Sequence, residues 1–187
     1  MIYSSSKNRK DYFPPLLGNG DIALWVDREG SVCDTEERTK DFLGPKGCVF
    51  RAGRRTAFTH SQSVQGVLMQ WGSLQFSCSS AVCAFTQELD PVTGTLLSHC
   101  DYEDGRSVDT VCYVHPQYNL YAVQKTFHGD FPSVVLELTL NQVLLDELRS
   151  LKITTEGSTA KVDMDVRAYD SYRAGIWLAS TAGEAVA

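Results

Sequence analysis

Long apolar runs are missing from this sequence. No stretch among its 187 residues reaches the roughly 18 apolar residues that a membrane-spanning helix needs. The opening residues, MIYSSSKNRKDYF, lack the apolar centre of a secretory signal. The sequence therefore predicts a cytoplasmic protein with no membrane partner.

Basic charge is scarce. Seventeen Lys and Arg against 23 Asp and Glu give a net charge of −6. An acidic surface offers no electrostatic partner to a phosphate backbone, so we expect no nucleic-acid partner. The one basic cluster, Arg51, Arg54 and Arg55 in RAGRR, is typical of a solvated loop.

Metal and nucleophile motifs are also absent. The six cysteines form no CxxC pair, the four histidines show no metal-ligand spacing, and no GxSxG elbow occurs. We therefore predict no metal and no cofactor. The missing export signal further predicts reduced, free and mostly buried cysteines.

Helical periodicity is rare. Only NQVLLDELRSLKI, residues 141–153, has apolar residues near helical spacing, and a strand-to-strand connection remains an alternative there. Elsewhere short alternating segments such as IALWV and KVDMDV follow one another, with turns such as DREG, DPVTG and EDGR between them. In DREG, Gly30 is free to take the positive φ that a three-residue hairpin loop requires. The pattern predicts an all-β antiparallel sandwich. SVVLELTLN is apolar almost throughout, which predicts a strand covered on both faces.

A hairpin is predicted in SHCDYEDGRSVDTVCYV, with its turn at Asp104-Gly105. If Glu103 pairs with Arg106, His99 faces Thr110, Cys100 faces Asp109 and Cys112 faces Leu97. Side chains alternate along a strand, so this register places the two cysteines on opposite faces and argues against a disulfide between them.

Two segments resemble a known family. LLGNGDIALWV, followed some sixty residues later by QELDPVTGTLLSHCDYEDGRSVDTVCYVHPQYNLYAVQKTF, is similar to the N-terminal β-sandwich of glycoside hydrolases with an (α/α)6 catalytic barrel, families 65 and 95. The matching positions are Gly18-Asn19-Gly20, Leu89-Asp90, Thr93-Gly94, Leu96 and Val114 to Val123.

The resemblance implies a two-sheet supersandwich of the galactose-mutarotase type. On this reading residues 1–12 are a tail, residues 13–187 are one sandwich domain, and the chain is part of a longer enzyme. The catalytic carboxylates of that family lie in the barrel, so no catalytic residue is carried over. The implied partners are the helical catalytic domain and, through the whole enzyme, carbohydrate; a homo-oligomer is a further expectation.

The candidate residues for contact with carbohydrate or a partner domain lie in the Gly-Asn-Gly loop, in two tryptophan-containing segments and in the RAGRR cluster. They are Asn19, Asp21, Trp25, Arg51, Arg54, Arg55 and Trp71. Asn19 and Asp21 can hydrogen-bond sugar hydroxyls or a partner domain, but Gly-Asn-Gly is also an ordinary tight turn. Trp25 and Trp71 can stack on a sugar or fill an interface or the core.

Four functions stay open on the sequence alone. The first is a non-catalytic β-sandwich domain of a carbohydrate-active enzyme, either a hydrolase or a phosphorylase, inactive by itself. The others are a stand-alone carbohydrate-binding module, an aldose-mutarotase-like enzyme with a histidine and a carboxylate as acid and base, and an oligomerisation domain.

Overall fold

The fold is all-β. The computed structural model describes residues 2–6, 12, 14–20, 22–32, 48–51, 68–118, 120–132, 134–140, 148–157, 159–166 and 173–179. These residues contain strands and turns, and no helix among them is long and apolar enough to cross a membrane. The chain divides into two compact units, Met1–Arg51 with Gln70–Thr139 and Ala52–Met69 with Leu140–Ala187.

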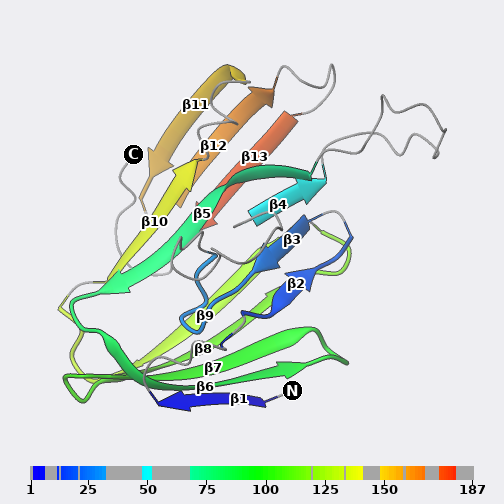
Figure 1. The fold of residues 1–187 in the computed structure, drawn as a ribbon. Coiled ribbons are helices and arrows are strands. Elements are labelled where there is room, and N and C mark those ends of the chain that lie inside the picture. The colour runs from blue at the N-terminus through cyan, green and yellow to red at the C-terminus, as the bar shows by residue number, and fades with distance from the viewer. Residues whose placement is uncertain are drawn as a thin grey trace. The chain divides into compact units, whose positions relative to one another are not determined.

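The first unit contains two antiparallel sheets (Figure 1). In spatial order, the first sheet consists of β1 (Ile2–Ser6), β6 (Val82–Asp90), β7 (Thr95–Tyr102), β8 (Ser107–Val114) and β9 (Tyr121–His128). The second sheet consists of β10 (Val134–Leu140), β5 (Leu68–Cys78), β4 (Cys48–Arg51), β3 (Ile22–Trp25) and β2 (Leu16–Gly18).

The inner faces of the two sheets form the core. In β3, Ile22 and Leu24 are buried and Ala23 and Trp25 are partly exposed, which is the alternation expected of a strand with one face in the core. The main cluster joins residues from the two sheets and the adjoining chain: Leu17, Leu24, Val26, Val32, Leu96 and Cys112. The predicted antiparallel β-sandwich is therefore confirmed in this unit.

The turn between β7 and β8 corrects the predicted register. Tyr102 N donates to Arg106 O at 2.9 Å and Gly105 N donates to Tyr102 O at 3.0 Å, so three residues form the loop. Gly105 has φ +82°, the left-handed conformation that closes such a loop. A three-residue loop shifts every cross-strand pair by one position from the two-residue turn that was predicted.

The shift changes the faces of the two hairpin cysteines. Cys100 pairs with Val108 and Cys112 pairs with Leu96, so both side chains lie on the inner face, contrary to prediction. They are four residues apart along the ladder, about 13 Å, which still excludes a disulfide between them. Cys78, Cys83, Cys100 and Cys112 are free thiols, whereas the side chains of Cys33 and Cys48 lie outside the described residues. Burial raises the pKa of Cys100 to about 12 and that of Cys112 to about 11.

The chain start is not simply a tail. Ile2–Ser6 form β1, which pairs antiparallel with β6 from Ile2 opposite Glu88 to Ser6 opposite Ala84. The far edge of β6 would otherwise present unpaired backbone groups, and an extended segment satisfies them whatever its side chains are.

The second unit contains a separate three-stranded antiparallel sheet, with β12 (Thr159–Val166) between β11 (Leu148–Glu156) and β13 (Arg173–Ala179). These strands pair with one another inside their own unit, and the single domain expected over residues 13–187 stays a prediction. The predicted helix is wrong for residues 148–153, because β11 begins at Leu148 and continues into Ile153, Thr154 and Thr155, residue types that favour strands. Residues 141–147 of that prediction lie outside the described residues.

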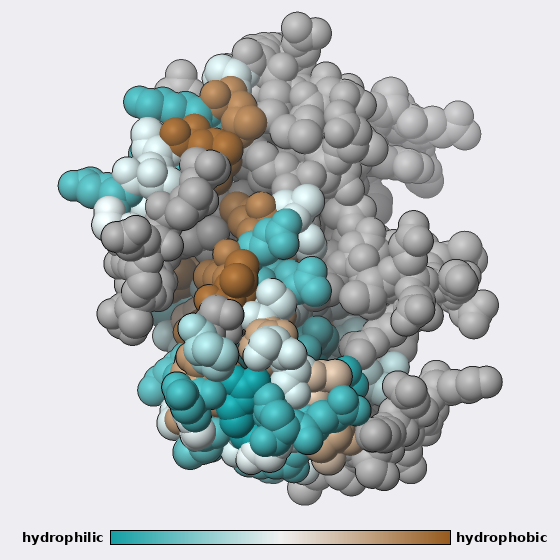
Figure 2. All heavy atoms as spheres, turned by 90° about the vertical axis from the view of Figure 1, so that its left-hand side faces the viewer, coloured by the Kyte–Doolittle hydropathy of each residue, from teal (hydrophilic) through white to brown (hydrophobic). Residues whose placement is uncertain are grey.

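Strand β10 differs from its predicted burial on both faces. Val134, Val135 and Leu136 are exposed, and β10 is an edge strand of its sheet. On the face shown in Figure 2, hydrophilic side chains of the described residues gather at the lower end.

Candidate functional site

The side chain of Asn19 links two turns through hydrogen bonds. Its Oδ1 accepts from Ile22 N at 3.0 Å, and its Nδ2 donates to His115 O at 3.0 Å and to Tyr118 O at 3.1 Å. The side-chain amide thus makes hydrogen bonds within the chain on both its oxygen and its nitrogen. Its geometry is that of an asparagine fixing a turn.

The other sequence-predicted contact residues are only partly described. Trp25 lies on the face of β3 that points away from the core, is partly buried, and pairs across the strands with the exposed Leu16. Arg51 lies in β4 and Trp71 in β5, but their side chains are outside the described residues. Asp21, Arg54 and Arg55 are outside them entirely. Of the predicted set, only Asn19 and Trp25 can be placed by their side chains.

The Asp27–Ser31 turn, which follows β3, is held by the inner face of the first sheet. Asp27 N donates to Ser31 O at 2.9 Å and Gly30 N donates to Asp27 O at 3.0 Å, and Gly30 has φ +75°. The sequence prediction of a three-residue loop closed by Gly30 is confirmed. Within the turn, Asp27 Oδ1 accepts from Glu29 N and Ser31 N, which fixes its shape.

Four successive carbonyls of this turn each accept a hydrogen bond from a side chain of the opposite sheet. The pairs are Gln87 Nε2 to Asp27 O, Cys100 Sγ to Arg28 O, Lys125 Nζ to Glu29 O, and Tyr121 OH to Gly30 O. Buried carbonyls need such donors because desolvation without a partner is costly. The turn is therefore a fixed part of the sandwich interior.

Lys125 is one of the charged residues of this interior. Its Nζ donates to Glu29 O and to Thr110 Oγ1, the latter at 3.1 Å, and lies 4.4 Å from the centre of the Phe76 ring. Burial lowers the pKa of this ammonium, an effect that the nearby Glu29 opposes. The donors and the ring replace part of the lost hydration.

A pocket of about 500 Å³ lies beside the turn, within the first unit. Its walls come from the turn, from β5, and from the connection into β6, and they combine one guanidinium, two carboxylates, hydroxyls and aromatic rings. The lining groups of most chemical interest are Arg28, Glu29, Phe76, Ser77, Phe85 and Glu103.

Arg28 is the least satisfied polar side chain of the pocket. Its Nε is buried and has no hydrogen-bond partner among the described residues. Its guanidinium instead lies over the Phe85 ring, 5.4 Å from the ring centre. Glu29, the next residue, has a partner for one oxygen, since Tyr102 OH donates to its Oε1 at 3.0 Å.

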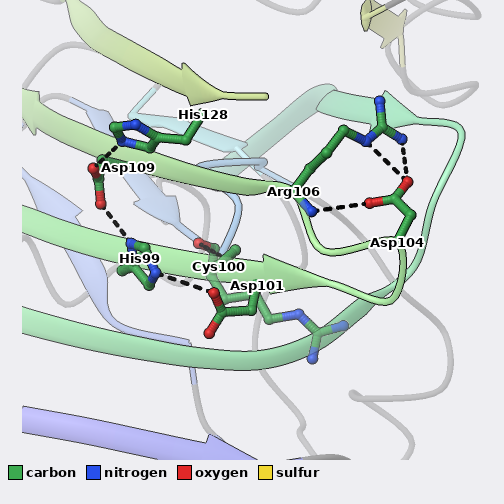
Figure 3. A network of polar contacts seen from close by, with 8 residues as sticks. His99, Cys100, Asp101, Asp104, Arg106, Asp109 and His128 are labelled. Atoms are coloured by element: carbon green, nitrogen blue, oxygen red, sulfur yellow. Dashed lines mark hydrogen bonds and ion pairs between the residues drawn. The ribbon is translucent and has the colours of Figure 1, made fainter. Parts of the chain in front are cut away.

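A second polar group lies on the outer face of the first sheet (Figure 3). His99 Nδ1 is 2.6 Å from Asp109 Oδ1, His99 Nε2 is 3.3 Å from Asp101 Oδ1, and His128 Nε2 is 2.7 Å from Asp109 Oδ2. Carboxylates accept, so both nitrogens of His99 find acceptors when the ring carries two protons. The sequence prediction that His99 faces Thr110 is off by one position, because His99 pairs with Asp109 in the corrected register.

We predict that His99 titrates above the ordinary histidine value of 6.5. The hydrogen bond to Asp109 raises the pKa of His99, and the same contact lowers the pKa of Asp109. A raised folded-state pKa stabilises the fold below about pH 6.5, and that stabilisation is lost as the pH rises through the folded value. The effect on stability should be about 1 kcal/mol or less, because the pair is exposed.

An NMR titration of the His99 ring checks this prediction. In Asp109→Asn the His99 midpoint should fall towards its ordinary value, and the stability of the variant should depend less on pH between about 6 and 8. Equal midpoints in the two proteins would show that Asp109 does not act on His99.

Sequence reasoning missed the groups that hold the turn and line the pocket. Gln87 and Lys125 occupy inward positions of their strands, beside Phe85 and Leu89 in one and Val123 and Phe127 in the other. A polar residue at an inward position of an alternating strand is a signal for a buried partner. It could have been read from the sequence, although the identity of the partner could not.

Comparison with known proteins adds no family to these features. No family model matches the sequence, and neither a curated protein nor a solved structure matches it. Fold and site together define a β-sandwich with a polar pocket beside a buried turn.

Proposed function

We propose that this chain is a non-catalytic β-sandwich domain of a cytoplasmic carbohydrate-active enzyme, a glycoside hydrolase or phosphorylase, and that it binds carbohydrate in the pocket beside the Asp27–Ser31 turn. The observation that carries the proposal is the pocket itself. Its volume of about 500 Å³ lies in the range of small-molecule sites.

The lining chemistry supports a polyhydroxylated ligand. Each sugar hydroxyl both donates and accepts, so a suitable wall offers both kinds of group close together. Arg28 supplies donors, Glu29 and Glu103 supply acceptors, and Ser77 supplies either. Phe76 adds apolar surface that matches the C–H faces of a sugar ring.

Packing on a helical catalytic domain is the second part of the proposal. The Asn19 turn is joined to the 115–120 turn, where Tyr118 is 66% and Leu120 48% exposed. Aromatic and aliphatic side chains of this kind act as anchors when a partner covers them. The family resemblance implies both parts of this arrangement: that the chain is a supersandwich and that its partner is a helical barrel.

Binding is favoured over mutarotase-like catalysis by the position of the histidines. Acid–base catalysis on an aldose needs a histidine and a carboxylate within hydrogen-bond reach of the same sugar. The His99 pairs with Asp101 and Asp109 lie on the outer sheet face, and the pocket lining contains no histidine among the described residues. A stand-alone carbohydrate-binding module would use the same pocket.

A glycan array with the chain as it stands tests the proposal. We expect binding in the micromolar range to a limited set of glycans, and no acceleration of aldose mutarotation. An array with no bound glycan contradicts carbohydrate binding, and accelerated mutarotation would replace the binding role with an enzymatic one.

A further inference from the structure

We infer that the pocket takes an uncharged sugar, and that the Arg28 guanidinium donates hydrogen bonds to its oxygen atoms. The inference rests on the proposed carbohydrate binding and specifies its ligand class. It comes from two features of the pocket wall: a guanidinium without a protein acceptor, and two carboxylates near it.

The chain contains a useful comparison for Arg28. Arg106 also lies over a phenylalanine ring, 4.3 Å from the centre of Phe131. Unlike Arg28, it has an acceptor at each of its three nitrogens: its side chain donates to Asp104, to Asp130 O at 3.0 Å and to Ser79 Oγ at 3.0 Å. The contact with Asp104 raises the pKa of Arg106 and lowers that of the carboxyl to about 2.

Arg28 has none of these acceptors. No hydrogen bond or ion pair of its side chain is found among the described residues, and its Nε is out of contact with solvent. A guanidinium carries five N–H donors in one plane. The enclosed Nε is closed to a ligand oxygen as it is to water, so the donors that Arg28 offers a ligand are those of its two Nη groups, for which no acceptor is found among the described residues.

The two carboxylates decide the charge of the ligand. Glu29 and Glu103 line the pocket with Arg28, so its wall carries two negative charges and one positive charge. An acidic sugar would add a third negative charge and be repelled. An uncharged sugar avoids this repulsion, because its hydroxyls accept from Arg28 and donate to the glutamates.

The unpartnered donor also predicts how a variant will fold. Arg28→Met keeps an apolar side chain of similar length over Phe85 and removes the buried, unpartnered Nε–H group. Its stability in urea should equal or exceed that of the native protein, because no protein–protein hydrogen bond is lost. Arg106→Met loses several hydrogen bonds, so it should be less stable.

Isothermal titration calorimetry with matched sugars tests the inference. The probes are glucose with glucuronate and galactose with galacturonate, each pair differing only in a carboxylate. We expect at least one hexose to bind, with its uronate about ten-fold weaker or more, and Arg28→Met to weaken hexose binding about ten-fold or more. Arg106→Met, whose side chain does not line the pocket, should leave hexose affinity within about two-fold.

A second variant makes the charge argument independent of Arg28. Glu103 is exposed, and Glu103→Gln should narrow the difference between hexose and uronate. If the uronate binds more tightly than the hexose, or if Arg28→Met binds hexose as well as the native chain does, this inference is wrong while carbohydrate binding stands. If none of these four sugars binds, this inference fails, and the proposed function fails with it only when the glycan array also shows no binding.

Discussion

Replacing Gly30 with alanine is expected to cost about 2–5 kcal/mol of unfolding free energy. Gly30 has φ +75°, and a Cβ there would lie 2.8 Å from Thr110 Cγ2 on the opposite sheet. The left-handed backbone strain and the steric conflict add, because the turn is held on four carbonyls and cannot move away freely. Urea unfolding followed by circular dichroism measures the loss.

Gly105→Ala is the matched control. The Gly105 turn has the same hydrogen-bond pattern and a similar φ of +82°, but nothing lies within 4 Å of an added Cβ. Only the backbone strain applies, so the expected cost is about 1–2 kcal/mol. Equal losses at Gly30 and Gly105 would show that the Asp27–Ser31 turn does not press against the first sheet.

Leu96→Ala should cost about 2–5 kcal/mol, whereas Leu97→Ala should cost less than about 1 kcal/mol. The two residues are neighbours in β7, yet Leu96 is 0% and Leu97 44% exposed. Leu96 belongs to the main core cluster, so its truncation leaves a cavity between the sheets. The midpoints of urea unfolding of the two variants give the comparison.

This pair also tests the hairpin register. Moving the pairing of a strand by one residue exchanges its two faces. If Leu97→Ala lost more stability than Leu96→Ala, the face of β7 that carries Leu97 would be the buried one. The cross-strand partners described above for Cys100 and Cys112 would then be wrong as well.

Much of the sandwich could be predicted because its strands alternate. Ile22, Leu24 and Val26, one face of the alternating IALWV segment, are all buried, and Gly30 closes a three-residue turn as expected. The β7–β8 register could not be obtained in this way, because Asp-Gly suits both a two-residue and a three-residue loop. β1 was not predicted, because residues 2–6 form a strand by pairing with the edge of β6 and not through a pattern of their own.

The candidate site was less predictable. Asn19 was recognised as a turn residue, and its hydrogen bonds agree with that reading. Arg28 lies in the DREG turn, and its Nε is enclosed only because that turn packs on strands about 60 to 100 residues later. The partners of an inward Gln87 or Lys125 are set by tertiary structure, which no local pattern contains.

The most direct measurement is an NMR titration of the ¹⁵N-labelled chain with glucose and with galactose, following the Nε–H signals of the arginines. A sugar bound in the pocket should move the Arg28 signal and the amide signals of nearby residues such as Glu29 and Phe76. The Arg106 signal should stay in place, because its donors are already engaged by Asp104, Asp130 and Ser79. A glycan that the array shows to bind, but that leaves Arg28 unmoved and shifts residues elsewhere, would contradict the assignment of the pocket as the carbohydrate site.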